Sequence, residues 1–111
     1  MIEDRFYLQH ILSSINKIQS YVQEGEGKFF QSQLVQDAVI RNFEIIGEAA
    51  KRLSEGGRAA HPTIPWKRIG GFRDVLIHHY FGVELRLVWK VIENDLPAMK
   101  SAVEHLLSGP S

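Results

Sequence analysis

The stretch "SQLVQDAVIRNFEIIGEAAKRL", residues 32–53, decides how the chain folds. Its apolar residues recur every three or four positions, which places them on one side of an α-helix. Gly47 lies inside this helix, where a glycine costs about 1 kcal/mol relative to alanine, so we expect another helix to cross closely there. The inner stripe of the helix consists of Val35, Val39, Phe43, Ile46, Ala50 and Leu53.

The other clear periodicities in the chain are also helical. A first helix is predicted over about residues 4–23, and the two glycines of "EGEGK" (residues 24–28) break it. Residues 54–65 read as one long connection that two prolines stiffen. The apolar stripe of the first helix consists of Leu8, Ile11, Leu12, Ile15, Ile18 and Val22.

Helices are predicted for the second half of the chain as well. Pro65 suits the first turn of a short helix over residues 66–69, after which Gly70-Gly71 is expected to redirect the chain into a segment that ends at Gly82. A further helix carries Leu85, Val88, Trp89 and Ile92, and Asp95 with Pro97 marks the start of the last one. The predicted fold is all-α, an antiparallel bundle of four to five helices.

Length and composition limit what this bundle can be. With 111 residues the chain is predicted to form a single domain over residues 1–111. It contains no cysteine, which excludes a disulfide framework and a thiolate metal site. The N-terminus lacks the apolar core of a signal peptide, and no apolar run approaches the ~18 residues of a membrane span. We therefore expect a cytoplasmic protein that does not enter the membrane.

The formal net charge of zero conceals a local basic band. Residues 51–73 hold six lysines and arginines against one acidic residue, Glu55. Such a band attracts an anion where the averaged charge shows nothing. An ordinary solvated surface would give the same pattern.

The segment "GGFRDVLIHHYFG", residues 70–82, concentrates polar groups that a bundle helix does not need. At about 100° per residue, one face holds the predicted core stripe of Phe72, Val75, Leu76 and His79, so His79 is expected to be a packing residue. His78 lies on a different face together with Asp74 and Phe81. Asp74 precedes His78 by four residues, so its carboxylate can reach and orient the imidazole.

Arg73 lies on a third face with Ile77 and Tyr80. Arg73 and His78 differ in direction by roughly 140°, so one ideal helix cannot aim both at one small group. Either the helix loosens near Gly82, or a second copy of the protein completes the site. The large apolar Ile77 and Phe81 lie away from the core stripe, which favours a contact surface and a symmetric dimer.

Arginine and histidine together suit the cleavage of an RNA phosphodiester. The histidine can transfer the proton of the 2′-hydroxyl or of the leaving oxygen, and the forked guanidinium can stabilise the phosphorane. On residue types alone, an ordinary surface cluster of Asp74, His78 and Arg73 is the better explanation, because an isolated Arg-x4-His pattern is a weak signal.

The pattern extends beyond Arg-x4-His. "RDVLIHHY" resembles the R-x4-H-x-Y signature of the HepT family, toxins of the HEPN superfamily. Three blocks in the same order resemble its second helix, its hallmark segment and its fourth helix: "IRNFEIIGEAAKRLS" (residues 40–54), "HPTIPWKRIGGFRDVLIHHYFGV" (61–83) and "LVWKVIENDLP" (87–97).

This resemblance implies an all-helical homodimer with a composite cleft at its two-fold axis. It implies a metal-independent endoribonuclease without a cofactor, with Arg73 and His78 as catalytic pair and Asp74 as a polar helper. It also implies a nucleotidyltransferase antitoxin of the MntA type, which transfers AMP from ATP to Tyr80. Four residues of the second helix are candidates for lining the cleft, with ordinary surface pairing as the alternative: Arg41, Asn42, Glu44 and Glu48.

Two further interpretations stay open beside the ribonuclease toxin. The chain could be a non-enzymatic helical partner or substrate-binding subunit of a nucleotidyltransferase, or a bundle with a purely structural role. The presence of Arg73, His78 and Tyr80 together favours the toxin.

Overall fold

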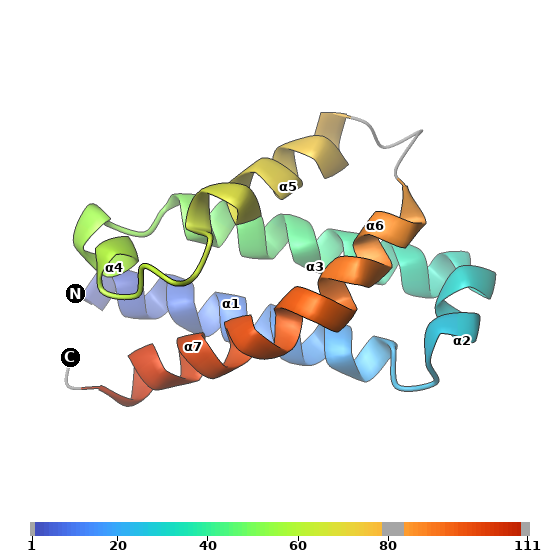
Figure 1. The fold of residues 1–111 in the computed structure, drawn as a ribbon, viewed down its shortest axis with the longest axis horizontal. Helices are drawn as coiled ribbons and strands as arrows, with labels where there is room; N and C mark the ends of the chain where they lie inside the picture. The colour runs from blue at the N-terminus through green and yellow to red at the C-terminus, as the bar shows by residue number, and fades with distance from the viewer. Residues whose placement is uncertain (1, 79–83, 110–111) are drawn as a thin grey trace.

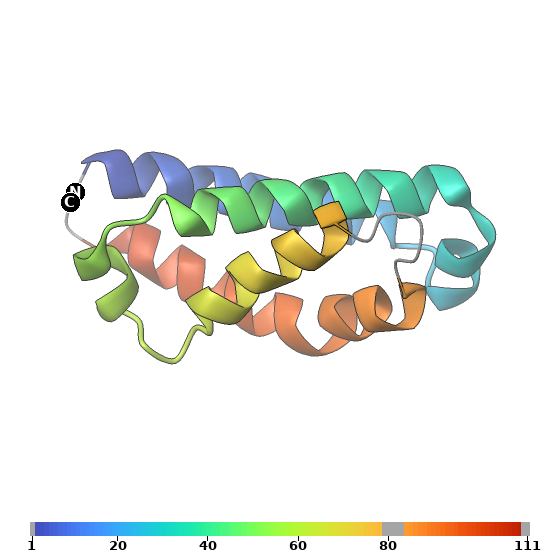
Figure 2. The ribbon, with the colours of Figure 1, turned by 90° about the horizontal axis from the view of Figure 1, so that it is seen from above.

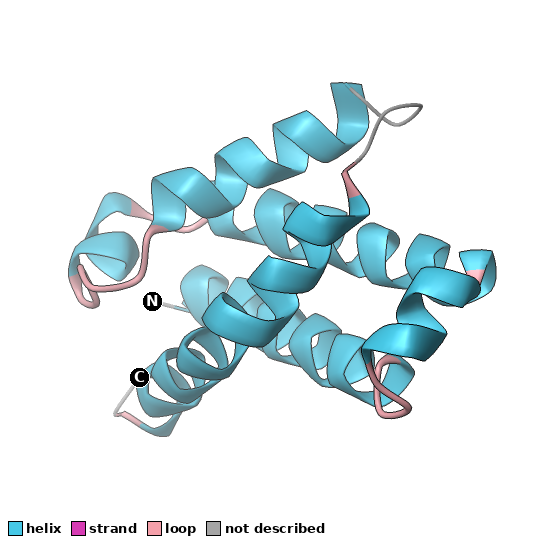
Figure 3. Ribbon diagram, turned by 45° about the vertical axis from the view of Figure 1, so that its right-hand side comes forward, coloured by secondary structure: helices cyan, strands magenta, loops and turns pink. Residues whose placement is uncertain are grey.

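The computed structural model describes residues 2–78 and 84–109, and in that part every regular element is a helix (Figure 3). The predicted all-α fold is confirmed, whereas the dimer stays a prediction. In chain order the elements are α1 (Ile2–Tyr21), α2 (Glu26–Gln31), α3 (Gln33–Lys51), α4 (Glu55–Ala59), α5 (Trp66–His78), α6 (Leu85–Lys90), the π-helical η1 (Val91–Asp95) and α7 (Leu96–Ser108).

The long helices form an antiparallel bundle. Helices α1 and α3 lie side by side and run in opposite directions (Figure 2). Helix α7, which continues from α6 and η1, packs on α1, and α5 packs on α3 (Figure 1). Helix α3 therefore supports both the core and the helix that carries the Arg-x4-His pattern.

The apolar stripes predicted for α1 and α3 form the core. Ile11, Ile15 and Ile18 on α1 are fully buried, and Val39 and Ile46 on α3 face them with 1% or less of their surface exposed. Burying each such side chain contributes about 1.5–3 kcal/mol. This burial fixes which side of α3 is left to receive α5.

Two short helices were not predicted. The turn after α1 ends at Gly25, whose φ is +92°. Helix α2 follows directly and buries Phe29 completely. In the long connection, the Ser54 hydroxyl accepts from the Gly57 backbone N–H at 2.9 Å and so caps α4. The Asp4 carboxylate accepts from the Ser54 backbone N–H, also at 2.9 Å, which ties α1 to α4.

The prediction that Gly70-Gly71 redirects the chain is wrong, because α5 runs without interruption through both glycines. Gly70 is buried, and a Cβ there would come within 3.2 Å of the Lys51 side chain, so this glycine permits close packing on α3. The start of α5 is fixed by Trp66, whose indole Nε1–H donates to the Arg58 carbonyl at 3.1 Å.

The predicted start of the last helix at Asp95 and Pro97 is confirmed, because α7 begins at Leu96 and has Pro97 in its first turn. The π-helical element before it was not predicted. The chain stays helical and widens into a π-turn, in which the Leu96 N–H donates to the Val91 carbonyl five residues earlier. A proline lacks an N–H, and its ring collides with the carbonyl four residues back in a regular helix. The wider turn accommodates Pro97 without a break between η1 and α7.

Candidate active site on helix α5

Helix α5 is covered on one side only. Leu76 is 1% exposed, and the Phe72 ring lies 5.3 Å from that of Phe43 on α3. Val75, predicted to belong to the same core stripe, is 45% exposed, so that prediction is wrong. The buried arc is narrow because, within the described residues, α3 is the one helix on which α5 packs extensively. The prediction that His79 packs in the core lies outside the described residues.

Arg73 lies where α5 comes closest to α3. A Cβ added at Gly47 would overlap the Cβ of Arg73, so only glycine allows this crossing. The close crossing predicted at Gly47 is confirmed. The Arg73 side chain is consequently pressed against the backbone of α3 and is 26% exposed.

Two carboxylates hold the guanidinium of Arg73. Its Nη2 lies 3.0 Å from Oε2 of Glu48, and its Nη1 lies 3.3 Å from Oδ1 of Asp74. Each carboxylate also binds a second cation from α3: Arg52 Nε reaches Glu48 Oε1 at 3.0 Å, and Lys51 Nζ reaches Asp74 Oδ1 at 2.7 Å. We call these five residues, Glu48, Lys51, Arg52, Arg73 and Asp74, the α3–α5 charge cluster.

The cluster shifts two pKa values in the directions expected for ion pairs. The hydrogen bond from Lys51 is the main cause that lowers the pKa of Asp74, and the charge of Arg73 adds to it. Glu48 is the main cause that raises the pKa of Arg52, and the Tyr7 hydroxyl adds to it. Both shifts favour the charged forms of Asp74 and Arg52.

The Asp74 carboxylate is thus engaged by Lys51 and Arg73. Among the hydrogen bonds and ion pairs of the described residues none joins it to His78, the partner suggested by the four-residue spacing. His78 is the last residue of α5 and is exposed. Arg73 and His78 are five residues and about 7.5 Å of helix rise apart, and they point in different directions. Tyr80 and Phe81 lie outside the described residues.

The four α3 candidates separate into three environments. Arg41 and Glu44 pair with each other at 3.8 Å in the surface arrangement that was the alternative for them. Asn42 is only 6% exposed and donates to the Ala38 carbonyl at 2.9 Å, so it faces the interior. Of the four, Glu48 is the one that an ion pair connects to Arg73.

Sequence reasoning did not find the roles of Lys51 and Arg52, which were counted only as part of the basic band. The pairing of Arg52 with Glu48 has a visible signal, the four-residue spacing on one helix. The pairing of Lys51 with Asp74 joins two helices and has none. In the structure four of the six cations of the band bind carboxylates.

Comparison with known proteins identifies the chain's relatives. Residues 11–106 match the family described as Ribonuclease HepT-like. The chain belongs to the HepT-like ribonuclease family. The family and the enzyme class predicted from the sequence, a ribonuclease, are thereby confirmed.

Three relatives are similar over nearly the whole chain. "Probable ribonuclease HepT" of Thermococcus cleftensis is 41% identical over 90% of this chain and 92% of its own length. "Putative RNase TTE0752" of Caldanaerobacter subterraneus is 38% identical, with 93% of both chains covered. "Gamma-glutamylcyclotransferase and putative RNase MJ0434" of Methanocaldococcus jannaschii is 47% identical, but the chain spans only 47% of its length. No solved structure matches the chain.

On this HepT-like bundle an apolar groove of about 1250 Å³ lies between α5 and the stretch α6–η1–α7, and Phe43 and Ile46 of α3 also line it. Phe72 and Val75 line one wall, and Leu87, Val91 and Met99 line the other. At one place Arg68 of α5 bridges the groove to Asp95 at 3.6 Å.

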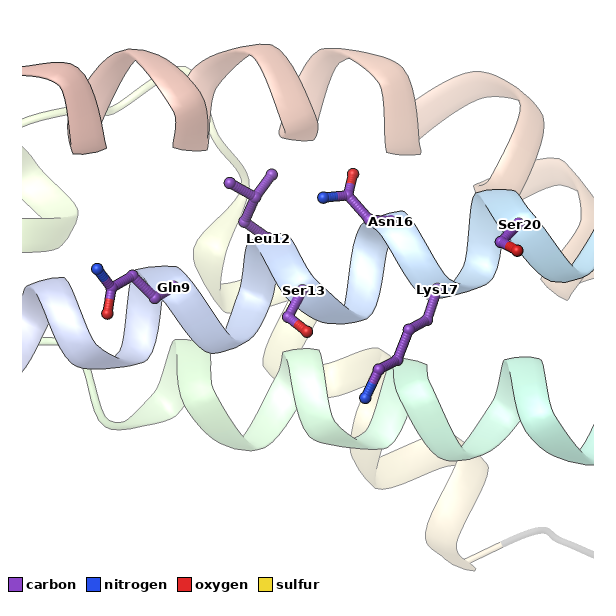
Figure 4. Close-up of a pocket in the computed structure, with 6 residues that line it drawn as sticks. All are labelled: Gln9, Leu12, Ser13, Asn16, Lys17 and Ser20. Carbon is purple, nitrogen blue, oxygen red and sulfur yellow. The ribbon is translucent and has the colours of Figure 1, made fainter.

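A second hollow lies on α1 and is formed by Gln9, Leu12, Ser13, Asn16, Lys17 and Ser20 (Figure 4). These side chains include one cation and no carboxylate or histidine, so they offer no acid–base pair. Among the described residues no group of three or more potential ligands could hold a metal ion, and no helix is long and apolar enough to cross a membrane. The α3–α5 charge cluster with His78 is therefore the candidate active site.

Proposed function

We propose that this chain is the endoribonuclease toxin of a toxin–antitoxin pair and cleaves RNA with Arg73 and His78. The observation that carries the proposal is the placement of Arg73, which Gly47 and Glu48 hold at the surface of the bundle with its guanidinium partly exposed. His78 follows on the same helix with an exposed side chain.

The proposed reaction uses the RNA's own nucleophile. His78 accepts the proton of the 2′-hydroxyl, whose oxygen attacks the phosphorus, while the bond to the 5′-oxygen breaks and that oxygen receives a proton. Arg73 stabilises the charge of the phosphorane, and Asp74 holds one terminal nitrogen of the guanidinium. The products are a 2′,3′-cyclic phosphate and a 5′-hydroxyl, and no step requires a metal ion.

The cleft is proposed to form between two copies of the chain. A single regular helix does not aim Arg73 and His78 at one phosphate. A homodimer would supply two histidines, one for each proton transfer. The exposed apolar side chain of Ile77, which lies between Arg73 and His78 in α5, supports an interface there.

The central test is RNA cleavage by the purified protein. Arg73→Ala and His78→Ala should each abolish cleavage and growth inhibition while the far-UV circular dichroism and thermal midpoint stay near those of the wild type. Cleavage should persist in EDTA and leave a 2′,3′-cyclic phosphate. Wild-type protein that does not cleave RNA would favour a non-enzymatic partner of a nucleotidyltransferase instead.

Regulation is proposed to act through Tyr80 and a nucleotidyltransferase antitoxin of the MntA type. The phenol oxygen would attack the α-phosphate of ATP, with release of pyrophosphate, and leave AMP on the tyrosine. The support is the H-x-Y pattern of residues 78–80 together with membership of the HepT-like family. The added phosphate is a ligand that an arginine such as Arg73 binds well.

Mass spectrometry tests this modification. After incubation with the transferase, ATP and magnesium, the AMP adduct should map to Tyr80 and RNA cleavage should stop. An adduct on Tyr7 or Tyr21, or a Tyr80→Phe variant that AMP transfer still silences, would contradict the proposal.

A further inference from the structure

We propose that Glu48 is a positioning residue for Arg73: its carboxylate, fixed from the other side by Arg52, sets the plane and direction of the guanidinium that meets the RNA phosphate. This inference rests on the proposed ribonuclease function and deepens it. It assigns to α3 a part of the active site that the Arg-x4-His pattern on α5 does not contain.

The first step concerns the freedom that Arg73 has left. Its Cβ is wedged against Gly47, so the start of the side chain cannot shift toward α3. Its Nε is buried and has no hydrogen-bond partner. Only the two terminal nitrogens can act on a ligand, and their direction depends on the groups that hold them.

The second step concerns what holds those nitrogens. Glu48 Oε2 binds Nη2 at 3.0 Å, while Glu48 Oε1 binds Arg52 Nε at 3.0 Å. The carboxylate is therefore held at both oxygens and cannot turn with the arginine. A carboxylate bound at one oxygen only would follow the guanidinium and would not direct it.

The third step separates Glu48 from Asp74. Asp74 is the neighbour of Arg73 on α5 and shares a single oxygen, Oδ1, between Lys51 and Arg73. Its distance to the guanidinium is longer, 3.3 Å against 3.0 Å. Each terminal nitrogen carries two N–H groups, so one on each nitrogen stays available for phosphate oxygens.

A role in stability alone does not account for this arrangement. Ion pairs with partly exposed side chains contribute little to folding, and those of Arg52 and Glu48 are 58% and 40% exposed. A charge that aims a catalytic arginine instead affects the transition state more than substrate binding. Its removal should therefore lower kcat and leave KM nearly unchanged.

The experiment compares Glu48→Gln with Glu104→Gln, a matched loss of charge at an exposed position on α7. Steady-state cleavage of a short RNA gives kcat and KM. The ¹H–¹⁵N signal of the Arg73 Nε–H, assigned by its loss in Arg73→Lys, reports the guanidinium directly without any need for activity.

For Glu48→Gln we expect kcat to fall by about 10- to 100-fold, KM to change by less than about threefold, and the Arg73 signal to move. Glu104→Gln should match the wild type in all three. If Glu48→Gln does not fold, Arg52→Gln replaces it, because it frees the same carboxylate from its other side, and should give a smaller loss of the same kind.

The failures of the two proposals are distinguishable. If Arg73→Lys loses cleavage while Glu48→Gln behaves as Glu104→Gln in kcat and in the Arg73 signal, the positioning role is wrong and the ribonuclease assignment stands. If the wild type does not cleave RNA, the proposed function is wrong, and the Arg73 signal in the wild type and in Glu48→Gln still decides whether Glu48 holds the guanidinium.

Discussion

The two sides of helix α5 meet opposite environments. Toward α3 the helices approach so closely that Gly47 tolerates no side chain, Leu76 is 1% exposed, and ion pairs cross the contact. Toward α6, η1 and α7 the same helix borders an open groove of about 1250 Å³, and Val75 is 45% exposed.

This difference separates the contacts that hold α5 in place from the surface that α5 exposes. The contact with α3 fixes the position and direction of α5 on the bundle, and therefore also the position of Arg73. The groove side adds little to that fixation and presents an apolar surface instead. Substitutions at the contact with α3 should therefore change stability, whereas substitutions at exposed apolar positions of α5 should change assembly.

The largest expected effect comes from two neighbouring residues on opposite sides of α5. Leu76→Ala should lower the free energy of unfolding by about 2–5 kcal/mol, because it empties a fully packed position. Val75→Ala should change it by no more than about 0.5 kcal/mol. Urea unfolding of both variants, at one protein concentration, measures the contrast. Equal losses would mean that the groove side is packed as tightly as the α3 side.

A second contrast uses two glycines. Gly47→Ala places a methyl group against Arg73 and should lower the free energy of unfolding by about 1–3 kcal/mol, with loss of RNA cleavage. Gly71→Ala meets no atom within 4 Å and should raise it by up to about 1 kcal/mol through better helix propensity. Thermal unfolding and cleavage assays test both. A stabilised, fully active Gly47→Ala protein would contradict the close crossing.

Sequence reasoning predicted the features that depend on a single helix. The stripes of α1 and α3 follow from periodicity, and Gly47 signalled a crossing because a glycine inside a helix needs a reason. The sequence did not tell which helix crosses there. That Arg73 is the residue opposite Gly47 depends on how α5 lies on α3, which local spacing does not record.

The errors have the same origin. Val75 fits a core stripe on a helical wheel. Such a stripe is buried over its full width only if several helices cover it, and in the described residues α3 is the one helix on which α5 packs extensively. Glu48 was a candidate, but its connection to Arg73 could not be distinguished from surface pairing without the fold.

The third prediction concerns assembly through the exposed face of α5 that holds Ile77. Ile77→Glu should leave the unfolding of the chain nearly unchanged, because Ile77 is 37% exposed. It should dissociate the proposed dimer and reduce cleavage together, since burying an unpaired charge in an interface is costly. Leu34→Glu is the matched control, because Leu34 is 81% exposed at the start of α3.

Sedimentation velocity at micromolar concentration distinguishes the outcomes. The wild type and Leu34→Glu should be dimers, and Ile77→Glu should be a monomer. A monomeric wild-type protein with full ribonuclease activity would exclude a site shared between two copies.

The smallest effect concerns the ion pairs that cross the contact between α5 and α3. Lys51 is the main cause that lowers the pKa of Asp74. A carboxyl whose pKa is lower in the folded state stabilises the fold above its unfolded pKa, near 3.9, and loses that contribution as the pH falls through the folded value. The contribution should therefore be complete at neutral pH and disappear only in acid below about pH 4.

Lys51→Gln removes that cause and should raise the pKa of Asp74 toward its ordinary value, while Arg73 still lowers it. Carboxyl titration by NMR measures the shift, and acid unfolding of the two proteins should differ only slightly because both groups are close to solvent. The pair Lys100 and Gln19, which joins α7 to α1 without a carboxylate, provides the control: Lys100→Gln should leave the Asp74 titration unchanged. An Asp74 pKa that stays equally low in Lys51→Gln would assign its lowering to Arg73 alone. The pKa of Asp74 would then depend only on its neighbour in α5. The contact between α5 and α3 would be held by Gly47 and Glu48, with no contribution from the pair of Lys51 and Asp74.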